Sequence, residues 1–146
     1  MDWKTKARIQ NVVSLLPESL GYQFYYRLQR HFGGLRNPDP REGLKAGIAT
    51  CEMIVDSGRD INDKVFLEIG TGWRINTPIA LWLCGAKKII TVDINPYIKL
   101  ELIRQDLKYI TDHQAEICDM FKNNLNTDRF RRLLTLESKN AAFRNY

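Results

Sequence analysis

The stretch VFLEIGTGW, residues 65–73, decides the fold of this chain together with IITVDIN at residues 89–95. Each stretch contains an apolar run of strand character, and a helix signal lies between them. The first run leads into a turn that holds Gly70 and Gly72, and the second run ends in Asp93. This order of strand, glycine turn, helix and acidic strand end is typical of nucleotide-cofactor sites. We therefore expect an α/β fold with a Rossmann-like parallel sheet.

The residues of the turn distinguish between cofactors. Dinucleotide-binding turns carry a third glycine where this chain has Ile75, and a carboxylate such as Glu68 is unfavourable beside a pyrophosphate. S-adenosylmethionine has a ribose, an adenine and a cationic amino-acid tail, and it tolerates that carboxylate. The stretch resembles motif I of class I S-adenosylmethionine-dependent methyltransferases, written D/E-x-G-x-G-x-G. Glu68, Gly70 and Gly72 match this motif, and Arg74 stands at the last glycine.

The resemblance implies a role for each residue around the turn. In that family an acidic residue after the second strand accepts hydrogen bonds from the ribose hydroxyls, and Asp93 matches it. Glu68 would orient the positive methionine end, and the glycines would let the backbone pass under the cofactor. Trp73 would flank the amino-acid tail. The expected cofactor-binding residues are Glu68, Gly70, Thr71, Gly72, Trp73, Asp93, Ile94 and Asn95. We expect their loop to lie at the carboxyl end of its strand, beside Asp93.

Other candidate site residues are less defined by the sequence. Arg74 has three interpretations: an ion pair with Glu68, a contact with the cofactor carboxylate, or exposure to solvent. No residue is a good candidate for the base that assists methyl transfer, so the catalytic residues are unknown. The three cysteines and two histidines are isolated along the chain. This spacing indicates neither a metal site nor a disulfide framework, and it suits a reducing cytoplasm.

Composition and length bound the remaining organisation. The chain has 146 residues, 44% of them hydrophobic and 27% charged, which is typical of a soluble globular domain. No apolar run approaches the roughly 20 residues that span a membrane. The net charge of +5 is compatible with nucleic acid, but the basic residues are spread along the whole chain, so this partner is not favoured.

We expect two parts, an N-terminal helical segment over residues 1–60 and the first part of a Rossmann-like cofactor-binding domain over residues 61–146. Only two strands are recognisable, over 65–69 and 87–93, so we expect the second part to be incomplete. Helical patterns cover residues 3–16, 22–32, 42–56, 78–84, 97–109, 112–121 and 128–136. Thr77 is the expected cap of the fourth of these helices and Pro78 its first residue.

The function predicted from these features is an S-adenosylmethionine-dependent methyltransferase, present as its cofactor-binding N-terminal portion, with an unknown class of methyl acceptor. We expect this chain alone to be inactive and its exposed strand edges to favour homo-oligomers. The alternative is a non-catalytic interaction or regulatory module with a Rossmann-like half-site. A nicotinamide-dependent oxidoreductase is a third interpretation, against which Ile75 counts. An unrelated α/β protein would use the two glycines merely as a strand-to-helix turn.

Overall fold

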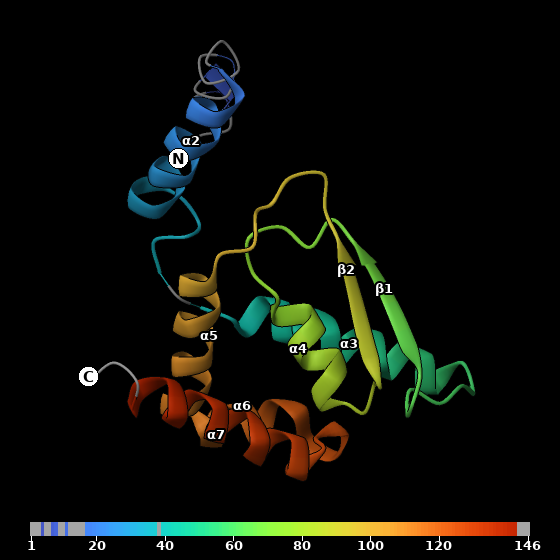
Figure 1. The fold of residues 1–146 in the computed structure, drawn as a ribbon. Helices are drawn as coiled ribbons and strands as arrows, with labels where there is room; N and C mark the ends of the chain where they lie inside the picture. The colour runs from blue at the N-terminus through green and yellow to red at the C-terminus, as the bar shows by residue number, and fades with distance from the viewer. Residues whose placement is uncertain (1–3, 5–6, 9–10, 12–16, 38, 143–146) are drawn as a thin grey trace. The chain divides into compact units, whose positions relative to one another are not determined.

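The computed structural model describes residues 4, 7–8, 11, 17–37 and 39–142 (Figure 1). The chain forms two compact units, Met1–Pro38 and Asp39–Tyr146. The division falls earlier than residue 60 because α3 (Arg41–Asp56) packs along α4 (Asn76–Leu83) and so belongs to the second unit.

The described part of the first unit is dominated by α2 (Glu18–Phe32). The helix starts four residues before the predicted Tyr22, since the carbonyl of Pro17 accepts hydrogen bonds from the amides of Leu20 and Gly21. A proline directly before the first turn is tolerated because the first amides of a helix have no partner within it. The helix predicted over residues 3–16 falls largely outside the described residues.

The sheet of the second unit consists, in its described residues, of β1 (Val65–Ile69) and β2 (Lys88–Val92). The strands run parallel, and Val65 is opposite Lys88 and Ile69 opposite Val92. The connection between them passes through α4 (Figure 1), as a parallel pair requires. The α/β class and the parallel start of a sheet are therefore confirmed, and β1 has the predicted bounds.

The helix α4 begins at Asn76, two residues before the predicted Pro78, and Thr77 is not its cap. The Thr77 hydroxyl instead donates to the carbonyl of Gly43 on α3, at 3.2 Å. Close packing of the two helices explains this, because a Cβ on Gly47 would lie 2.4 Å from the Cβ of Ala80. Glycines on α3 thus let α4 approach closely.

The C-terminal elements form the rest of the second unit. They are α5 (Leu100–Asp112), α6 (Gln114–Phe121), the 3₁₀ turn η1 (Lys122–Asn124) and α7 (Thr127–Ala142). α7 packs on α5 and α4, and fully buried side chains such as Leu44, Leu83, Ile110 and Phe121 fill the core. Arg129 on α7 donates to the carbonyls of Trp82 at 2.7 Å and Ala86 at 2.6 Å, which ties α7 to the end of α4.

Candidate cofactor site

The glycine loop after β1 has the backbone conformation that its sequence requires. Gly70 and Gly72 have φ of +82° and +72°, in the left-handed region that residues with a side chain rarely adopt. The Gly72 amide donates to Oδ2 of Asp93 at 2.7 Å, and the Gly70 amide donates to the carbonyl of Val92 at 2.8 Å. The prediction that this loop lies beside Asp93 is therefore confirmed.

A second set of contacts joins the same loop to the segment after β2. The rings of Trp73 and Tyr97 lie with their centroids 4.7 Å apart. The side-chain amide of Asn95 donates to the hydroxyl of Tyr97 at 2.9 Å. These contacts hold residues 93–99 outside a helix, so α5 begins at Leu100 and not at the predicted Tyr97.

Two buried polar atoms, one near the end of β1 and one in the loop, have no hydrogen-bond partner among the described residues. Oε2 of Glu68 and Oγ1 of Thr71 are both buried, and no described group forms a hydrogen bond with them. An unsatisfied buried oxygen costs free energy, and such atoms in proteins are usually met by water or by a ligand. Both residues are members of the predicted cofactor-binding set.

The outer side of the loop is open. A Cβ built on Gly70 or Gly72 would meet no atom within 4 Å, so nothing in the described structure fills the space over these two residues. Ile94, one of the predicted cofactor-binding residues, is 98% exposed. The structure thus brings Gly70, Gly72, Trp73 and Asp93 together and leaves Ile94 directed to solvent.

Arg74 forms no ion pair with Glu68 and is not exposed to solvent, so two of its three expected positions are wrong. Its guanidinium forms an ion pair with Asp106 on α5, and the two side chains are 13% and 0% exposed. Burial raises the pKa of Asp106 to about 6, and the attraction of Arg74 and a hydrogen bond from Asn76 oppose this rise only in part. A buried ion pair with α5 therefore fixes the position of Arg74, directly after the loop.

Asp106 and Asn76 were missed by the sequence prediction. A signal for Asp106 exists, because Leu102 and Ile110 lie four residues before and after it, and all three side chains are fully buried. An acidic residue on a buried helical stripe requires a partner, and Arg74 provides it. The sequence contains no comparable signal for Asn76.

Comparisons with known proteins give no family for this chain. No protein-family model matches the sequence, and neither curated proteins nor solved structures show a match. Among the described residues, no helix is long and apolar enough to cross a membrane. The same residues contain no group of three or more His, Cys, Asp or Glu side chains placed to hold a metal ion. The geometry of the loop is therefore the basis for a functional proposal.

Proposed function

We propose that this chain binds S-adenosylmethionine and is the cofactor-binding portion of a class I methyltransferase whose methyl acceptor is unspecified. The observation that carries the proposal is the hydrogen bond from the Gly72 amide to Asp93. This hydrogen bond directly joins the glycine loop that follows β1 to the acidic residue that follows β2. Both lie at the carboxyl ends of two parallel strands. Ligands of open α/β sheets bind at this position.

The residues around the loop fit this cofactor. Asp93 uses one oxygen for the Gly72 amide and one, at 3.4 Å, for the amide of Asn95. A carboxylate has about four lone-pair sites, so it can still accept bonds from ribose hydroxyls. The unpartnered Glu68 oxygen suits a cationic amino-acid tail, and the open space over the glycines admits a ligand close to the backbone. When bound, S-adenosylmethionine supplies an electrophilic methyl group.

A non-catalytic module with the same half-site is the second candidate. The observation that favours it is that the sheet of the described residues has two strands. Efficient transfer chemistry requires a pre-organised site that excludes water. Both candidates predict binding of the cofactor, and only the first predicts methyl transfer.

Calorimetric titration with S-adenosylmethionine tests the shared prediction. We expect Asp93→Ala to weaken binding about tenfold or more, because a hydrogen bond to a charged group contributes about 1.5–3 kcal/mol. Asp93→Asn keeps an acceptor for the Gly72 amide and removes only the charge, so it separates loop order from ligand contact. Glu42→Ala is the matched control, since this carboxylate is 87% exposed on α3. Unchanged affinity in Asp93→Ala, or no binding by the unmodified chain, would refute the proposal.

A further inference from the structure

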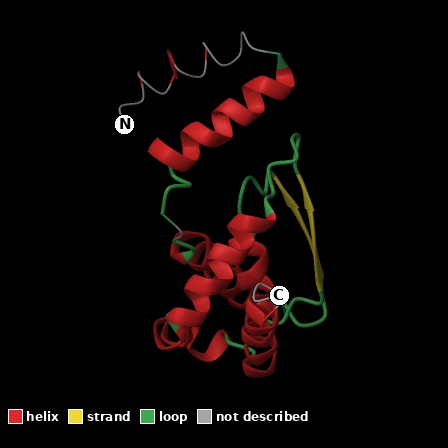
Figure 2. Ribbon diagram, turned by 60° about the vertical axis from the view of Figure 1, so that its left-hand side comes forward, coloured by secondary structure: helices red, strands yellow, loops and turns green. Residues whose placement is uncertain are grey.

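The fold brings two of the three cysteines together, although they lie 33 positions apart in the sequence. Cys51 is on α3 and Cys84 directly follows α4, and both side chains belong to the core of the second unit. Figure 2 shows the helices of this unit together on one side of the two strands, and α3 packs along α4 within this group. Both cysteines are free thiols.

The register between α3 and α4 is evident from what surrounds the two glycines of α3. A Cβ on Gly43 would lie 2.6 Å from the Cβ of Asn76, and a Cβ on Gly47 would lie 2.4 Å from the Cβ of Ala80. Each contact joins residues 33 positions apart, so a step of four residues along one helix is matched by a step of four along the other. Residues four positions apart lie on the same face of a helix. The next pair in this register is the two cysteines.

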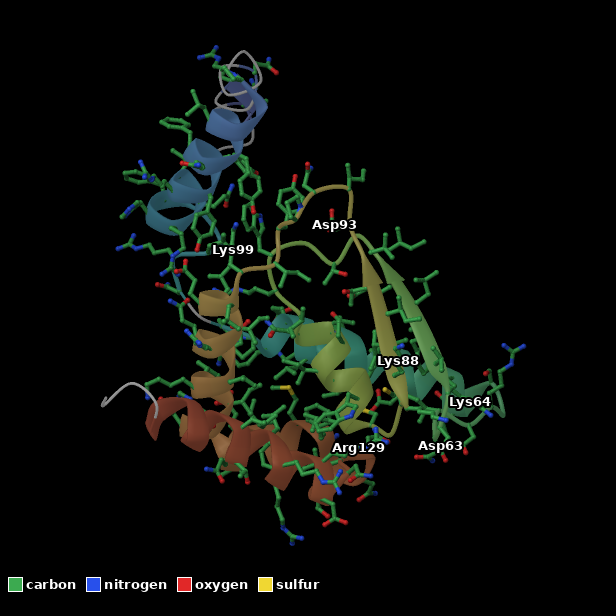
Figure 3. All side chains as sticks on the ribbon, in the orientation of Figure 1. Asp63, Lys64, Lys88, Asp93, Lys99 and Arg129 are labelled. Atoms are coloured by element: carbon green, nitrogen blue, oxygen red, sulfur yellow. The ribbon has the colours of Figure 1, made fainter. Side chains whose placement is uncertain are left out.

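The end of α4 holds Cys84 in this register. Its amide donates to the carbonyl of Ala80 at 2.9 Å, as in a further helical turn. Arg129 donates to the carbonyls of Trp82 and Ala86. These two carbonyls flank the cysteine in the sequence, and Figure 3 shows Arg129 near this end of α4. The thiol is therefore held opposite its partner on α3.

The two thiols interact directly. The Cys84 thiol donates a hydrogen bond to Cys51, and this bond lowers the pKa of the Cys51 thiol, while burial opposes the change. The pKa of Cys84 is raised, first by its hydrogen bond with Cys51 and then by burial. Cys51 is therefore the thiol that more readily becomes a thiolate, which is the reactive form of cysteine. Cys84 is 9% exposed and Cys51 2%, so the pair borders solvent on the side of Cys84.

We propose that Cys51 and Cys84 form a reversible disulfide that links α3 to α4 when the chain meets a peroxide. A disulfide joins Cβ atoms about 3.8 Å apart, and the preceding turns of these helices approach more closely than this. One thiolate attacks hydrogen peroxide, which leaves a sulfenic acid and releases hydroxide. The other thiolate attacks the sulfenic sulfur, forms the S–S bond and releases a second hydroxide. The two protons lost by the thiols convert both hydroxides to water, so the sulfurs give up two electrons and the peroxide accepts them.

Sequence separation alone does not favour this pair. Cys84 lies 33 positions after Cys51 and 34 positions before Cys118, so in an unfolded chain its two disulfides close loops of nearly equal cost. The fold selects one of them, because Cys51 follows the register of the two packed helices. The folded chain should therefore form one link and the unfolded chain a mixture. This inference is independent of cofactor binding, since it uses no residue of the glycine loop.

Peptide mapping of the full chain after treatment with hydrogen peroxide tests the inference. Trypsin cuts after Lys and Arg, so the three cysteines fall in separate peptides, 46–59, 75–87 and 109–122. Remaining thiols are alkylated in urea before digestion. We expect peptide 46–59 linked to peptide 75–87 in folded chain of monomer mass, and dithiothreitol should reverse the link. The same treatment in urea should give comparable amounts of this link and of the link between 75–87 and 109–122.

Thermal unfolding measures the consequence of the link. A disulfide that closes a loop of this length should raise the Tm of the oxidised chain by about 10 °C. Cys118→Ser is the matched control and should leave both the link and the rise in Tm intact, because Cys118 is outside the pair. Cys84→Ala should abolish both. Circular dichroism spectra identical to that of the unmodified chain confirm that each variant is folded before treatment.

Each outcome decides the question. A link between 46–59 and 75–87 as the main product of the folded chain, kept in Cys118→Ser and lost in Cys84→Ala, supports the proposal. No link, a comparable amount of a link to Cys118, or a link formed only between two chains overturns it. A Tm that does not rise on oxidation also overturns it, because the native packing then does not accommodate the bond.

Discussion

Removing the guanidinium of Arg74 leaves a carboxylate buried without its cation, and this change tests the anchor beneath the glycine loop. We choose Arg74→Met, which keeps much of the apolar stem and removes the charge. Loss of one partner from a buried ion pair costs about 3–5 kcal/mol, because the remaining charge is uncompensated. Asp106 is fully buried, so it has no route to solvent. We expect the free energy of unfolding to fall by about 3 kcal/mol or more near neutral pH.

The pH dependence follows from the pKa of Asp106, which is raised from 3.8 to about 6 in the folded chain. Between these values the native state binds the proton more tightly than the unfolded state. The contribution of Asp106 to stability is therefore greatest below about pH 4 and decreases as the pH rises through 6, by about 3 kcal/mol in total. In Arg74→Met the attraction that opposes this rise is lost, so the decrease is larger and continues to higher pH.

Urea unfolding at about pH 4 and about pH 8 measures both effects. The variant and the unmodified chain should differ little at the lower pH, where Asp106 is protonated, and strongly at the higher pH. The double variant Arg74→Met, Asp106→Asn should recover much of the loss, since no charge is then buried. Arg131→Met is the control, because its ion pair with Asp128 is exposed and contributes at most about 1 kcal/mol. A loss in Arg74→Met that is independent of pH would refute the reasoning.

Three further predictions concern the core that supports the site. Gly47→Ala places a methyl group 2.4 Å from a side-chain carbon of α4 and should destabilise the fold by about 1–3 kcal/mol; an unchanged Tm would contradict this packing. Arg129→Ala removes two charged hydrogen bonds to carbonyls and should lower the unfolding free energy in urea by about 1.5–3 kcal/mol or more. A thiol reagent should modify the half-buried Cys118 well before the buried Cys51 and Cys84; simultaneous reaction of all three would show that the core opens readily.

The elements that sequence predicted well are those with strong local signals. The strand Val65–Ile69 is a continuous apolar run bounded by turns, and its bounds are as predicted. The helix α3 starts only one residue before its predicted start. Its prediction succeeded because apolar side chains recur along it at helical spacing. The glycine loop and its proximity to Asp93 were also predicted, since the order of strand, turn, helix and strand dictates where the carboxyl ends of parallel strands meet.

The features that sequence missed depend on contacts between distant residues. The Thr77 hydroxyl does not cap α4, because it donates to the carbonyl of Gly43, a residue 34 positions earlier. The delayed start of α5 follows from the contact between Tyr97 and Trp73. Local capping rules predicted a later start for α4 and an earlier start for α5 than the structure has. In both cases tertiary packing overrode the local preference. The sequence likewise did not predict that Val65, Leu67 and Ile69 are exposed on one face of the sheet. An apolar strand does not indicate which of its faces a neighbouring element covers.

The two anchors of the glycine loop have a consequence for ligand binding. Gly72 within the loop is held by Asp93, and Arg74, which follows the loop, is held by Asp106, so both are tied to residues that follow β2. A loop already fixed in this way loses little conformational entropy when a ligand binds, and ordering of loops is one of the main costs of association. Asp93 can accept ribose hydroxyls without releasing the Gly72 amide. Binding therefore adds hydrogen bonds to an ordered loop, and its affinity should depend on the ion pair below the loop as well as on the residues that contact the ligand.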